Sequence, residues 1–311
     1  MKNKDIIKKI TQRLKSPSKI TLSLPEKDFR ILEASKILRN IGLDVITSDE
    51  IKVDKKDYLP ILEKNKFSSN WPAEKLESYA KDHYIRSLCM LLDNRVDGVI
   101  CGCTLPTSQV LRGALRIIGL QISSKWLSSM FLMVRKKSNS FITFADCAVI
   151  PDPNSQQLVE IAFEAAKMHQ KITGIKAKIG FLSFSTMGSA EHYRIKIVKD
   201  AVELFGKKTS EFDYEGEVQL DAAINAKISK KKISNSKLKG NANTLIFPNL
   251  DAGNIAYKLM QEFGSHYACG PLLLGLNKPV NDLSRGASVE DIVLISIITA
   301  LQIENAKNAN L

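Results

Sequence analysis

The sequence predicts an α/β protein with mostly parallel sheets, and three observations lead to that prediction. Short apolar runs of strand length alternate with longer segments of helical periodicity along most of the chain. Residue types that commonly begin or end helices stand at the boundaries between these patterns. The chain has 311 residues, 44% of them hydrophobic and 25% charged, which is enough for two ordinary domains with sizeable cores.

The first half of the chain begins with a short amphipathic segment and then alternates strands with helices. Gly42 ends the first long helical pattern, as glycine commonly does at a helix C-terminus. A basic turn separates the last two strands of this half. The predicted strands are 19–24, 43–47, 96–102, 129–134 and 140–147. The predicted helices after the N-terminal one are 27–42, 73–93 and 107–118.

The second half continues the alternation. Asn154 or Ser155 is suited to cap a long helix that ends near Gly174. The predicted strands are 177–185, 243–248 and 271–275. The other predicted helices are 189–206, 252–264 and a last one from about 288 to 306. There is no internal repeat and no Gly/Pro/Ser-rich linker, so two domains would be joined by short crossings, with the cleft between them as the expected site.

The charge balance favours anionic partners. The formal net charge is +12 and the pI is about 9.3. Nucleic acid, a membrane surface or a phosphorylated metabolite would each fit this balance. Only 7% of the residues are aromatic, and none are interleaved with basic ones as in nucleic-acid-binding segments. A solvated lysine-rich surface, with no nucleic-acid partner, is therefore the preferred interpretation.

The cysteines and the N-terminus favour a cytoplasmic protein without a metal site. The five cysteines lie in apolar surroundings, and the pair Cys101 and Cys103 lacks a second Cys or His pair at zinc-ligand spacing. Buried thiols in a reducing compartment are expected. The N-terminus lacks an apolar core of signal-peptide length, and no apolar run approaches the roughly 20 residues of a membrane span.

Three junctions place small polar residues between a strand and a helix. The first contains Ser183, Thr186, Gly188 and Ser189, whose hydroxyl and backbone N–H groups suit a phosphate or carbonyl oxygen; Ser189 could equally be a simple N-cap. The second, residues 247–258, contains Asn254. Glycine-rich dinucleotide and Walker motifs and a GxSxG motif are absent from the sequence.

The third junction is "KPVNDLSRGASVEDIV", residues 278–293. Ser288 and Asp291 have capping-box spacing, which gives Asp291 a structural interpretation. A cap has no use for the neighbouring Arg285, so this arginine is the strongest candidate for a functional side chain.

Together these junctions resemble the phosphate acetyltransferase (phosphotransacetylase) family, also called the phosphate acetyl/butyryltransferase family. The C-terminal motif is close to a family signature. The similarity is firm from about residue 141 and looser before it. The segments that carry it are 144–162, 179–192, 215–224, 245–261 and 270–293, with "LPEKDFRILEA" (24–34) and "DGVICGCTLPTSQVLRGAL" (97–115) as N-terminal landmarks.

The resemblance implies two three-layer α/β domains with a cleft between them, like the isocitrate/isopropylmalate dehydrogenases. Domain one would be 1–127 plus 274–311 and carry the Ser-Arg-Gly motif. Domain two would be 128–273 and contribute to the substrate cleft and to a homodimer. The implied reaction is the reversible conversion of acetyl-CoA and phosphate to acetyl phosphate and CoA, with no metal and no tightly bound cofactor.

The resemblance also implies residue roles for direct transfer in a ternary complex. Asp291 would be the base for the CoA thiol, Ser284 would assist, and Arg285 would orient acetyl phosphate and stabilise developing charge. Alternatively, Arg285 and the helix dipole lower the thiol pKa while Asp291 only positions Ser284. The implied substrate- and CoA-binding residues are Arg112, Ser183, Thr186, Gly188, Ser189, Asn254 and Asn281.

Three departures from the family pattern leave alternatives open. Met187 replaces a lysine, Leu274 a glutamine and Glu262 an arginine. Their consequence could be weaker CoA binding, a changed acyl preference or lost activity. The alternatives to an acetyltransferase are thus a phosphate butyryltransferase or broader acyl specificity, and a non-catalytic acyl-CoA-binding homologue.

Overall fold

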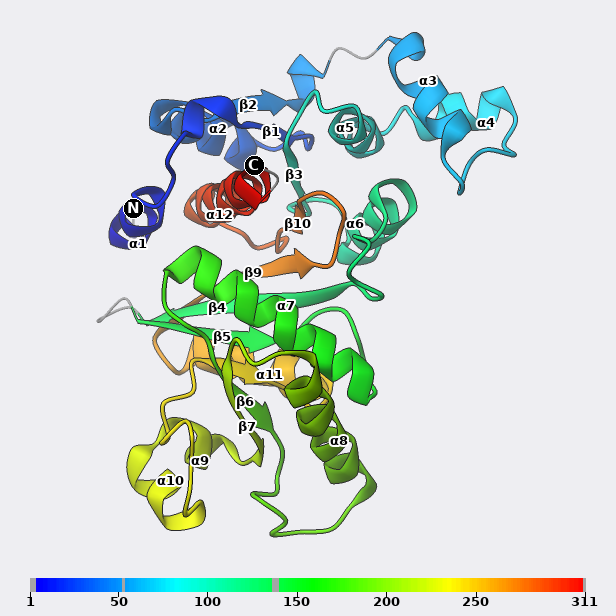
Figure 1. Cartoon of the computed structure of the whole chain (residues 1–311). Helices are drawn as coiled ribbons and strands as arrows, with labels where there is room; N and C mark the ends of the chain where they lie inside the picture. Colours follow the sequence, from blue (N-terminus) through cyan, green and yellow to red (C-terminus); the bar gives the residue numbers. More distant parts are fainter. Residues whose placement is uncertain (1–3, 52–53, 136–139, 310–311) are drawn as a thin grey trace. The chain divides into compact units, whose positions relative to one another are not determined.

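The computed structural model describes residues 4–51, 54–135 and 140–309. The chain divides into two compact units. Unit 1 comprises Met1–Lys125 and Gly275–Leu311, and unit 2 comprises Trp126–Leu274. The two ends of the chain therefore belong to the same unit (Figure 1).

Unit 1 contains a four-stranded parallel sheet in the order β10-β3-β1-β2. Helices α2 and α12 cover one face, and α5 and α6 cover the other (Figure 1). The strands are β1 Thr21–Leu24, β2 Asp44–Thr47, β3 Gly98–Cys101 and β10 Val280–Asp282. The helices are α1 Lys4–Thr11, α2 Phe29–Ile41, α3 Lys55–Lys64, α4 Ala73–Tyr79, α5 His83–Leu92, α6 Thr107–Gly113 and α12 Val289–Ala309, with a π-helical turn over Ala114–Ile118.

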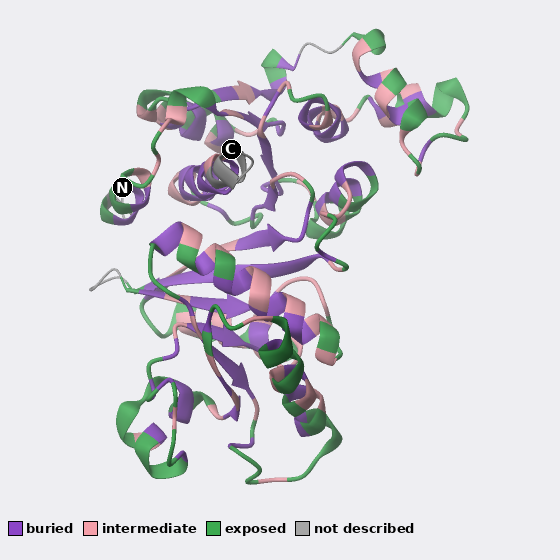
Figure 2. Cartoon of the chain, viewed as in Figure 1, coloured by how far each residue is buried: buried purple, intermediate pink, exposed green. Residues whose placement is uncertain are grey.

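The C-terminal helix α12 lies in the core of unit 1. Residues 292–303 of this helix are all buried, which is why it lacks the one-sided apolar stripe of a surface helix (Figure 2). Its buried hydroxyls are satisfied within the helix, since Ser296 and Thr299 each donate to the carbonyl oxygen four residues earlier. The beginning of α12 is therefore held in place by a fully packed helix behind it.

Unit 2 contains a six-stranded mixed sheet in the order β7-β6-β8-β5-β4-β9. Strands β4, β5 and β9 pair antiparallel around β4, and the other pairs are parallel. The strands are β4 Ser128–Arg135, β5 Phe141–Ala145, β6 Lys178–Leu182, β7 Asp213–Val218, β8 Thr244–Ile246 and β9 His266–Leu274. The helices are α7 Ser155–Thr173, α8 Tyr193–Lys208, α9 Leu220–Ile224, α10 Ala226–Lys232 and α11 Leu250–Glu262.

Local capping explains why several predicted helix ends are confirmed. Asn154 accepts from the Gln157 N–H while the Gln157 side chain accepts from the Asn154 N–H, which forms a complete capping box for α7. Gly174 ends that helix with φ of 73°, and Gly42 ends α2 with φ of 97°. The predicted α/β class with mostly parallel pairing is also confirmed.

Two predicted helices differ from the structure. The segment 73–93 forms two helices, because the Asp82 side chain accepts from the Tyr84 N–H and starts α5 anew. Helix α8 begins at Tyr193 rather than at residue 189, since the Ser189 hydroxyl accepts from the Thr186 N–H inside the preceding loop and His192 is the N-cap.

Several elements escaped the sequence prediction. The last strand of unit 2, β9, has nine residues rather than five. Strand β10 has only three residues, too few to show the alternation of a strand. The predicted basic turn between β4 and β5 lies partly outside the described residues. The unpredicted elements are α3, β7, α9, α10 and β10.

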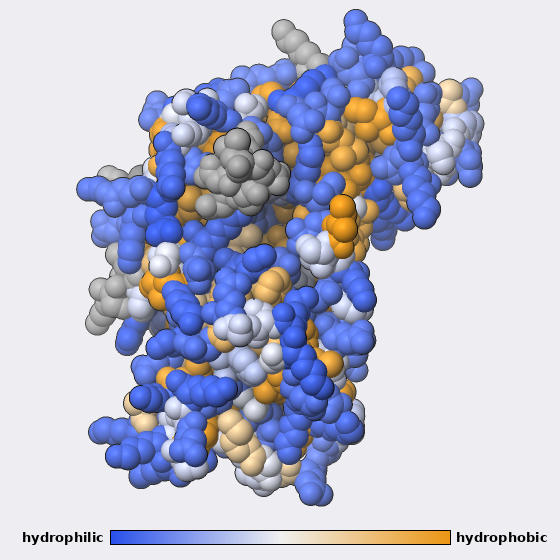
Figure 3. All heavy atoms as spheres, in the orientation of Figure 1, coloured by the Kyte–Doolittle hydropathy of each residue, from blue (hydrophilic) through white to orange (hydrophobic). Residues whose placement is uncertain are grey.

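Side-chain burial agrees with the sequence in two respects. All five cysteines are free thiols and buried. Hydrophilic side chains cover most of the face shown in Figure 3, with apolar residues gathered over α5 and α6 in unit 1. Within the described residues, no helix has both the length and the apolarity needed to cross a membrane.

Gly102 provides a test of how closely β3 and β10 approach. It has φ of 113°, and a Cβ there would overlap the Asp282 carboxylate and lie 2.7 Å from the Leu283 nitrogen. We expect Gly102→Ala to lower the free energy of unfolding by roughly 3 kcal/mol or more, because left-handed strain and overpacking add. Urea unfolding measures this.

Gly42→Ala is the matched control for that substitution. Gly42 also has positive φ, but the nearest atom to a Cβ there, on Pro17, is 3.7 Å away. Its expected cost is therefore only the backbone strain, about 1–2 kcal/mol. Equal costs at the two glycines would show that the contact between Gly102 and Asp282 is not tight.

Candidate active site

The loop between β10 and α12 presents Ser284 and Arg285 to solvent. Both residues are exposed, as is Gly286. The loop leaves the sheet in a fixed direction because the Leu283 N–H donates to the Cys101 carbonyl, 2.7 Å away, beside the end of β3. The Ser284 hydroxyl accepts from the Gly286 N–H at 3.3 Å, and within the described part of the chain the Arg285 guanidinium has no hydrogen-bond or ion-pair partner.

Asp291 forms the capping box of helix α12. Its Oδ2 accepts from the Ser288 N–H at 2.9 Å and from the Ser288 hydroxyl at 2.7 Å, and its own N–H donates to that hydroxyl oxygen at 3.2 Å. The structural interpretation of Asp291 is therefore correct. Both contacts of the carboxylate with Ser288 use Oδ2, so a base role would fall to Oδ1.

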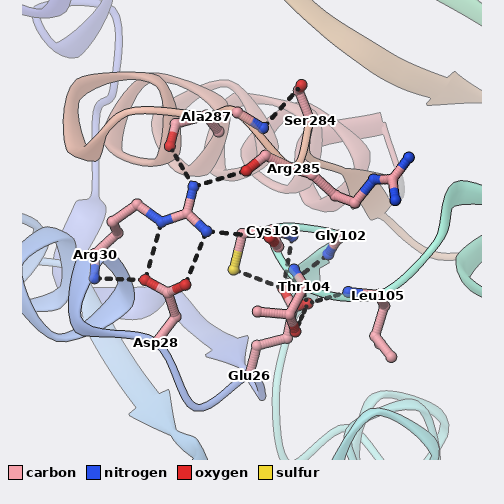
Figure 4. A network of polar contacts seen from close by, with 11 residues as sticks. Glu26, Asp28, Arg30, Gly102, Cys103, Thr104, Leu105, Ser284, Arg285 and Ala287 are labelled. Carbon is pink, nitrogen blue, oxygen red and sulfur yellow. Dashed lines mark hydrogen bonds and ion pairs between the residues drawn. The ribbon is translucent and has the colours of Figure 1, made fainter.

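Arg30, near the start of α2, binds the same loop from behind. Its Nη1 donates to the carbonyl oxygens of Arg285 at 2.9 Å and Ala287 at 2.8 Å. Its Nη2 also reaches the Cys103 carbonyl at 3.1 Å, after β3. Figure 4 shows the Arg285 side chain extending away from this network. The sequence analysis missed Arg30, because its partners are far away in the chain.

Asp28 holds the Arg30 guanidinium in a bidentate pair. The distances are 2.9 Å from Nε to Oδ1 and 2.8 Å from Nη2 to Oδ2. The hydrogen bonds from the Arg30 side chain are the main reason that the pKa of Asp28 lies below its ordinary value. Asp28 also accepts from the Arg30 N–H and thereby caps α2. One aspartate thus fixes both the helix start and the guanidinium.

Glu26 organises the loop after β3. Its carboxylate accepts from four consecutive backbone N–H groups, those of Gly102, Cys103, Thr104 and Leu105, at 2.7–2.9 Å. Burial opposes ionisation of Glu26, but the hydrogen bonds from Thr104, Cys103 and the backbone outweigh it and lower its pKa. This turn, which has the form of an anion-binding nest, is therefore occupied by the chain's own carboxylate.

Asp282 lies beneath the Ser284–Arg285 loop and is fully buried. Its Oδ2 accepts from the Thr107 hydroxyl at 2.7 Å, whereas its Oδ1 has no partner among the described residues. Burial, together with the negative charge of Glu26, raises the pKa of Asp282 to about 7 despite the Thr107 hydrogen bond. Sequence analysis did not single out Asp282, because its hydrogen-bond partner Thr107 is far away in the chain.

Two other residues of unit 1 were predicted to bind substrate or CoA. Arg112 lies in the last turn of α6 and is exposed. Asn281, in contrast, is fully buried, and its amide donates to Thr299 Oγ1 and Gln302 Oε1. Asn281 anchors β10 to α12, so we leave it out of the candidate site.

In unit 2, the β6–α8 loop carries the predicted serine and threonine residues and is hydrogen-bonded to Glu217 and Gln219. The Glu217 Oε1 accepts from the Gly188 N–H at 2.7 Å and from the Ser185 hydroxyl at 2.9 Å. Thr186 is buried and exchanges hydrogen bonds with Gln219, while Ser183, Gly188 and Ser189 keep partial or full exposure. The loop is thus tied internally by another carboxylate.

Asn254 lies near the start of α11. Its Nδ2 donates to the Cys147 carbonyl at 3.1 Å, beside the buried Asp146, whose carboxylate accepts from the N–H groups of Ala148, Val149 and Ile150. Asn254 therefore ties α11 to the loop after β5. The structure thus places Ser284, Arg285, Asp291 and Arg112 in unit 1, and Asn254 with the β6–α8 loop in unit 2.

Comparison with known proteins identifies the family. Residues 6–300 match the profile of the phosphate acetyl/butaryl transferases. The phosphate acetyltransferase of Acetivibrio thermocellus is 35% identical, covering 97% of this chain and 99% of the relative. The chain belongs to the phosphate acetyl/butaryl transferase family. The corresponding enzyme of Clostridium acetobutylicum is 37% identical over 96% of this chain and 98% of the relative.

Solved structures agree with membership of the phosphate acetyl/butaryl transferase family. The EutD phosphotransacetylase from Staphylococcus aureus aligns with a TM-score of 0.85 at 32% identity, covering 96% of this chain and 98% of that one. A putative 4-hydroxythreonine-4-phosphate dehydrogenase from Salmonella typhimurium, at 11% identity and a TM-score of 0.53, shares the fold alone. The predicted family and the dehydrogenase-like fold class are confirmed.

Asp282 generates a prediction about pH. In the folded state its pKa is raised to about 7, above its ordinary value of 3.8, so folding favours the protonated form. The carboxyl therefore costs stability as pH rises from about 4 to 7, and the cost is fully present above pH 7. We therefore expect the free energy of unfolding of Asp282→Asn, measured relative to that of the wild type, to increase by about 2–3 kcal/mol as the pH is raised from 5 to 8.

Urea unfolding of both proteins at several pH values between 5 and 8 measures that difference. Asn keeps an acceptor oxygen for Thr107, so the comparison isolates the charge. Glu63→Gln, an exposed carboxylate in the same unit, should leave the difference flat with pH. A flat profile for Asp282→Asn as well would mean that Asp282 is not buried as described.

Proposed function

We propose that this protein is a phosphate acetyltransferase, which transfers an acetyl group reversibly between CoA and inorganic phosphate. The chain is an acyltransferase by family membership. The observation that carries the proposal for this chain is Arg285: an exposed guanidinium without a partner in the described structure, next to Ser284, on a loop whose backbone is held from behind. Substrates are acetyl-CoA, CoA, phosphate and acetyl phosphate.

Arg285 is suited to the charge changes of acyl transfer. In the direction of acetyl-CoA synthesis, the CoA thiolate attacks the carbonyl carbon of acetyl phosphate, and the bond to the phosphate oxygen breaks so that phosphate leaves with the electron pair. Negative charge gathers on the carbonyl oxygen and on the phosphate. A guanidinium binds phosphate bidentately, and a preorganised cation lowers the energy of the transition state.

The start of α12 adds to this positive field. Ser284 and Arg285 lie just ahead of the N-terminus of a helix 21 residues long. Helix N-termini carry partial positive charge and favour bound anions. The exposed Ser284 hydroxyl can donate to a thiolate or a phosphate oxygen, because it acts as the acceptor in its hydrogen bond with the Gly286 N–H. We propose that Ser284 assists the thiol in this way.

Asp291 remains a candidate for two roles. As a base it would remove the thiol proton; as a cap it would fix Ser288 and the helix start next to Ser284. The two hydrogen bonds from Ser288 to its Oδ2 support the capping role. In that case Arg285 and the helix dipole lower the pKa of the CoA thiol, which is near 8.5 when free.

Binding residues outside the loop are proposed from their position and exposure. Arg112 supplies an exposed cation in unit 1 for the phosphates of CoA. In unit 2, Ser183, Gly188 and Ser189 offer exposed polar groups, and Thr186 and Asn254 support their loops. We also propose a cytoplasmic homodimer that needs no tightly bound cofactor, while a butyryl or broader acyl specificity is the alternative for the acyl group.

A coupled assay of phosphate-dependent CoA release tests the function. We expect turnover with acetyl-CoA, compared against propionyl- and butyryl-CoA, and a loss of 10²-fold or more in kcat for Arg285→Ala. Arg285→Lys should recover little of it, because lysine lacks the planar fork. Arg13→Ala, at an arginine outside the loop, is the control. The absence of phosphate-dependent turnover with all three substrates would contradict the proposal.

A second kinetic experiment separates the two roles of Asp291. If Asp291 is the base, Asp291→Asn should lower kcat by 10²–10⁴-fold, whereas Ser288→Ala, which removes only the capping partner, should cost far less. If Asp291 is a cap, the two variants should have similar losses of under about tenfold, since Asn keeps an acceptor oxygen. Steady-state kcat with saturating phosphate and acetyl-CoA decides between these outcomes.

A further inference from the structure

We propose that Arg30 is a positioning residue for the acyl transfer, which holds the peptide backbone that follows the Arg285 side chain in its working orientation. This inference rests on the proposed function, because it assigns to Arg30 the orientation of Arg285. Arg30 itself touches no reacting atom in the proposed chemistry.

The first support is that the Arg30 guanidinium is fully used. Arginine has five N–H donors in a rigid plane. Here Nε and one Nη2 hydrogen go to the Asp28 carboxylate, both Nη1 hydrogens go to the carbonyls of Arg285 and Ala287, and the other Nη2 hydrogen goes to the Cys103 carbonyl. Every donor has an acceptor within 3.1 Å, so the guanidinium has one geometry in which all are satisfied.

The second support is the position of the acceptors in the chain. The Arg285 carbonyl precedes α12, which starts at Val289, and therefore receives no intrahelical hydrogen bond. Holding this carbonyl fixes the peptide plane that follows Arg285, and the Leu283 N–H bond to Cys101 fixes the backbone before it. The direction in which the Arg285 side chain leaves the backbone is thereby set from both sides (Figure 4).

The third support is that Arg30 joins three loops of unit 1. Asp28 belongs to the loop after β1, Cys103 to the loop after β3, and Arg285 and Ala287 to the loop after β10. The Arg30 and Asp28 side chains are only 18% and 14% exposed, so water competes weakly for these donors. A lysine at this position would have three donors on one nitrogen and could not span the same acceptors.

Arg30→Ala and Arg30→Lys, measured against Arg39→Ala, test the proposal. Arg39 lies on the same helix, and its guanidinium also binds a carbonyl, that of Val45, and a carboxylate, that of Glu50. We expect both Arg30 variants to lose 10- to 100-fold in kcat, with KM for acetyl-CoA changed less than about threefold, and Arg39→Ala to keep its kcat. Millimolar guanidinium should restore part of the activity of Arg30→Ala and none of that of Arg39→Ala.

Asp28→Asn is the second variant, in case Arg30→Ala folds poorly. Asn keeps the oxygen that caps α2 but places an amide donor against the guanidinium, so we expect a smaller loss in kcat, of about 3- to 10-fold. The proposal is overturned if Arg30→Lys and Asp28→Asn both keep kcat within threefold of the wild type. It is also overturned if their losses merely follow the unfolded fraction seen by circular dichroism.

Hydrogen–deuterium exchange of the segment 283–288 separates this proposal from the proposed function. If Arg30 holds the loop, Arg30→Ala should speed amide exchange there at least tenfold, with exchange in β1 and β3 unchanged, whether or not the wild type turns over acetyl-CoA. Unchanged exchange in the loop would overturn the positioning role even in an active enzyme. Faster exchange in a chain without phosphate-dependent turnover would leave the positioning geometry standing and remove the proposed function.

Discussion

The five-fold hydrogen bonding of one guanidinium is the interaction on which the candidate site depends. The loops after β1, β3 and β10 are not joined to one another by the hydrogen bonds of the sheet. Arg30 links them through its bonds to Asp28, Cys103, Arg285 and Ala287. The loop that carries Arg285 continues into the buried helix α12, whose packing fixes the C-terminal end of the loop. The exposed Arg285 thus lies on a loop whose backbone is hydrogen-bonded on both sides of it. In the proposed reaction, such preorganisation would avoid a reorganisation cost in the transition state.

Local signals in the sequence predicted those parts of the fold that are decided locally. The ends of α7 were predictable because the hydrogen bonds of Asn154 and Gly174 that cap this helix are made with residues only three or four positions away in the sequence. The local prediction failed at Ser189, which has the chemistry of a helix cap but whose hydroxyl accepts from the Thr186 N–H inside a loop. It also failed at β10, whose three residues become a strand only because β3 is beside them.

The candidate site divides in the same way. Ser284, Arg285 and Asp291 were predictable because they lie within one contiguous motif. Arg30 and Asp282 were not, because their roles come from partners that are distant in sequence, and a single arginine on a helix surface resembles any other. Asn281 shows the opposite error, since a polar residue next to a functional motif turned out to serve the core. A residue's closeness in sequence to the motif indicates where the site is. Only the hydrogen bonds of the folded chain distinguish side chains available to a substrate from those that support the fold.

The carboxylates of Glu26 and Glu217 occupy hydrogen-bond donors of the chain's own loops that could otherwise bind anions. Glu26 fills a turn of four backbone N–H groups of the kind that captures phosphate in other proteins, and Glu217 accepts from the Gly188 N–H and the Ser185 hydroxyl in the β6–α8 loop. In a chain with a net charge of +12, unfilled turns would be traps in which phosphate or the CoA tail could bind unproductively. The chain therefore places its own carboxylates where anionic substrates could otherwise bind, whereas the Arg285 guanidinium pairs with no carboxylate among the residues described.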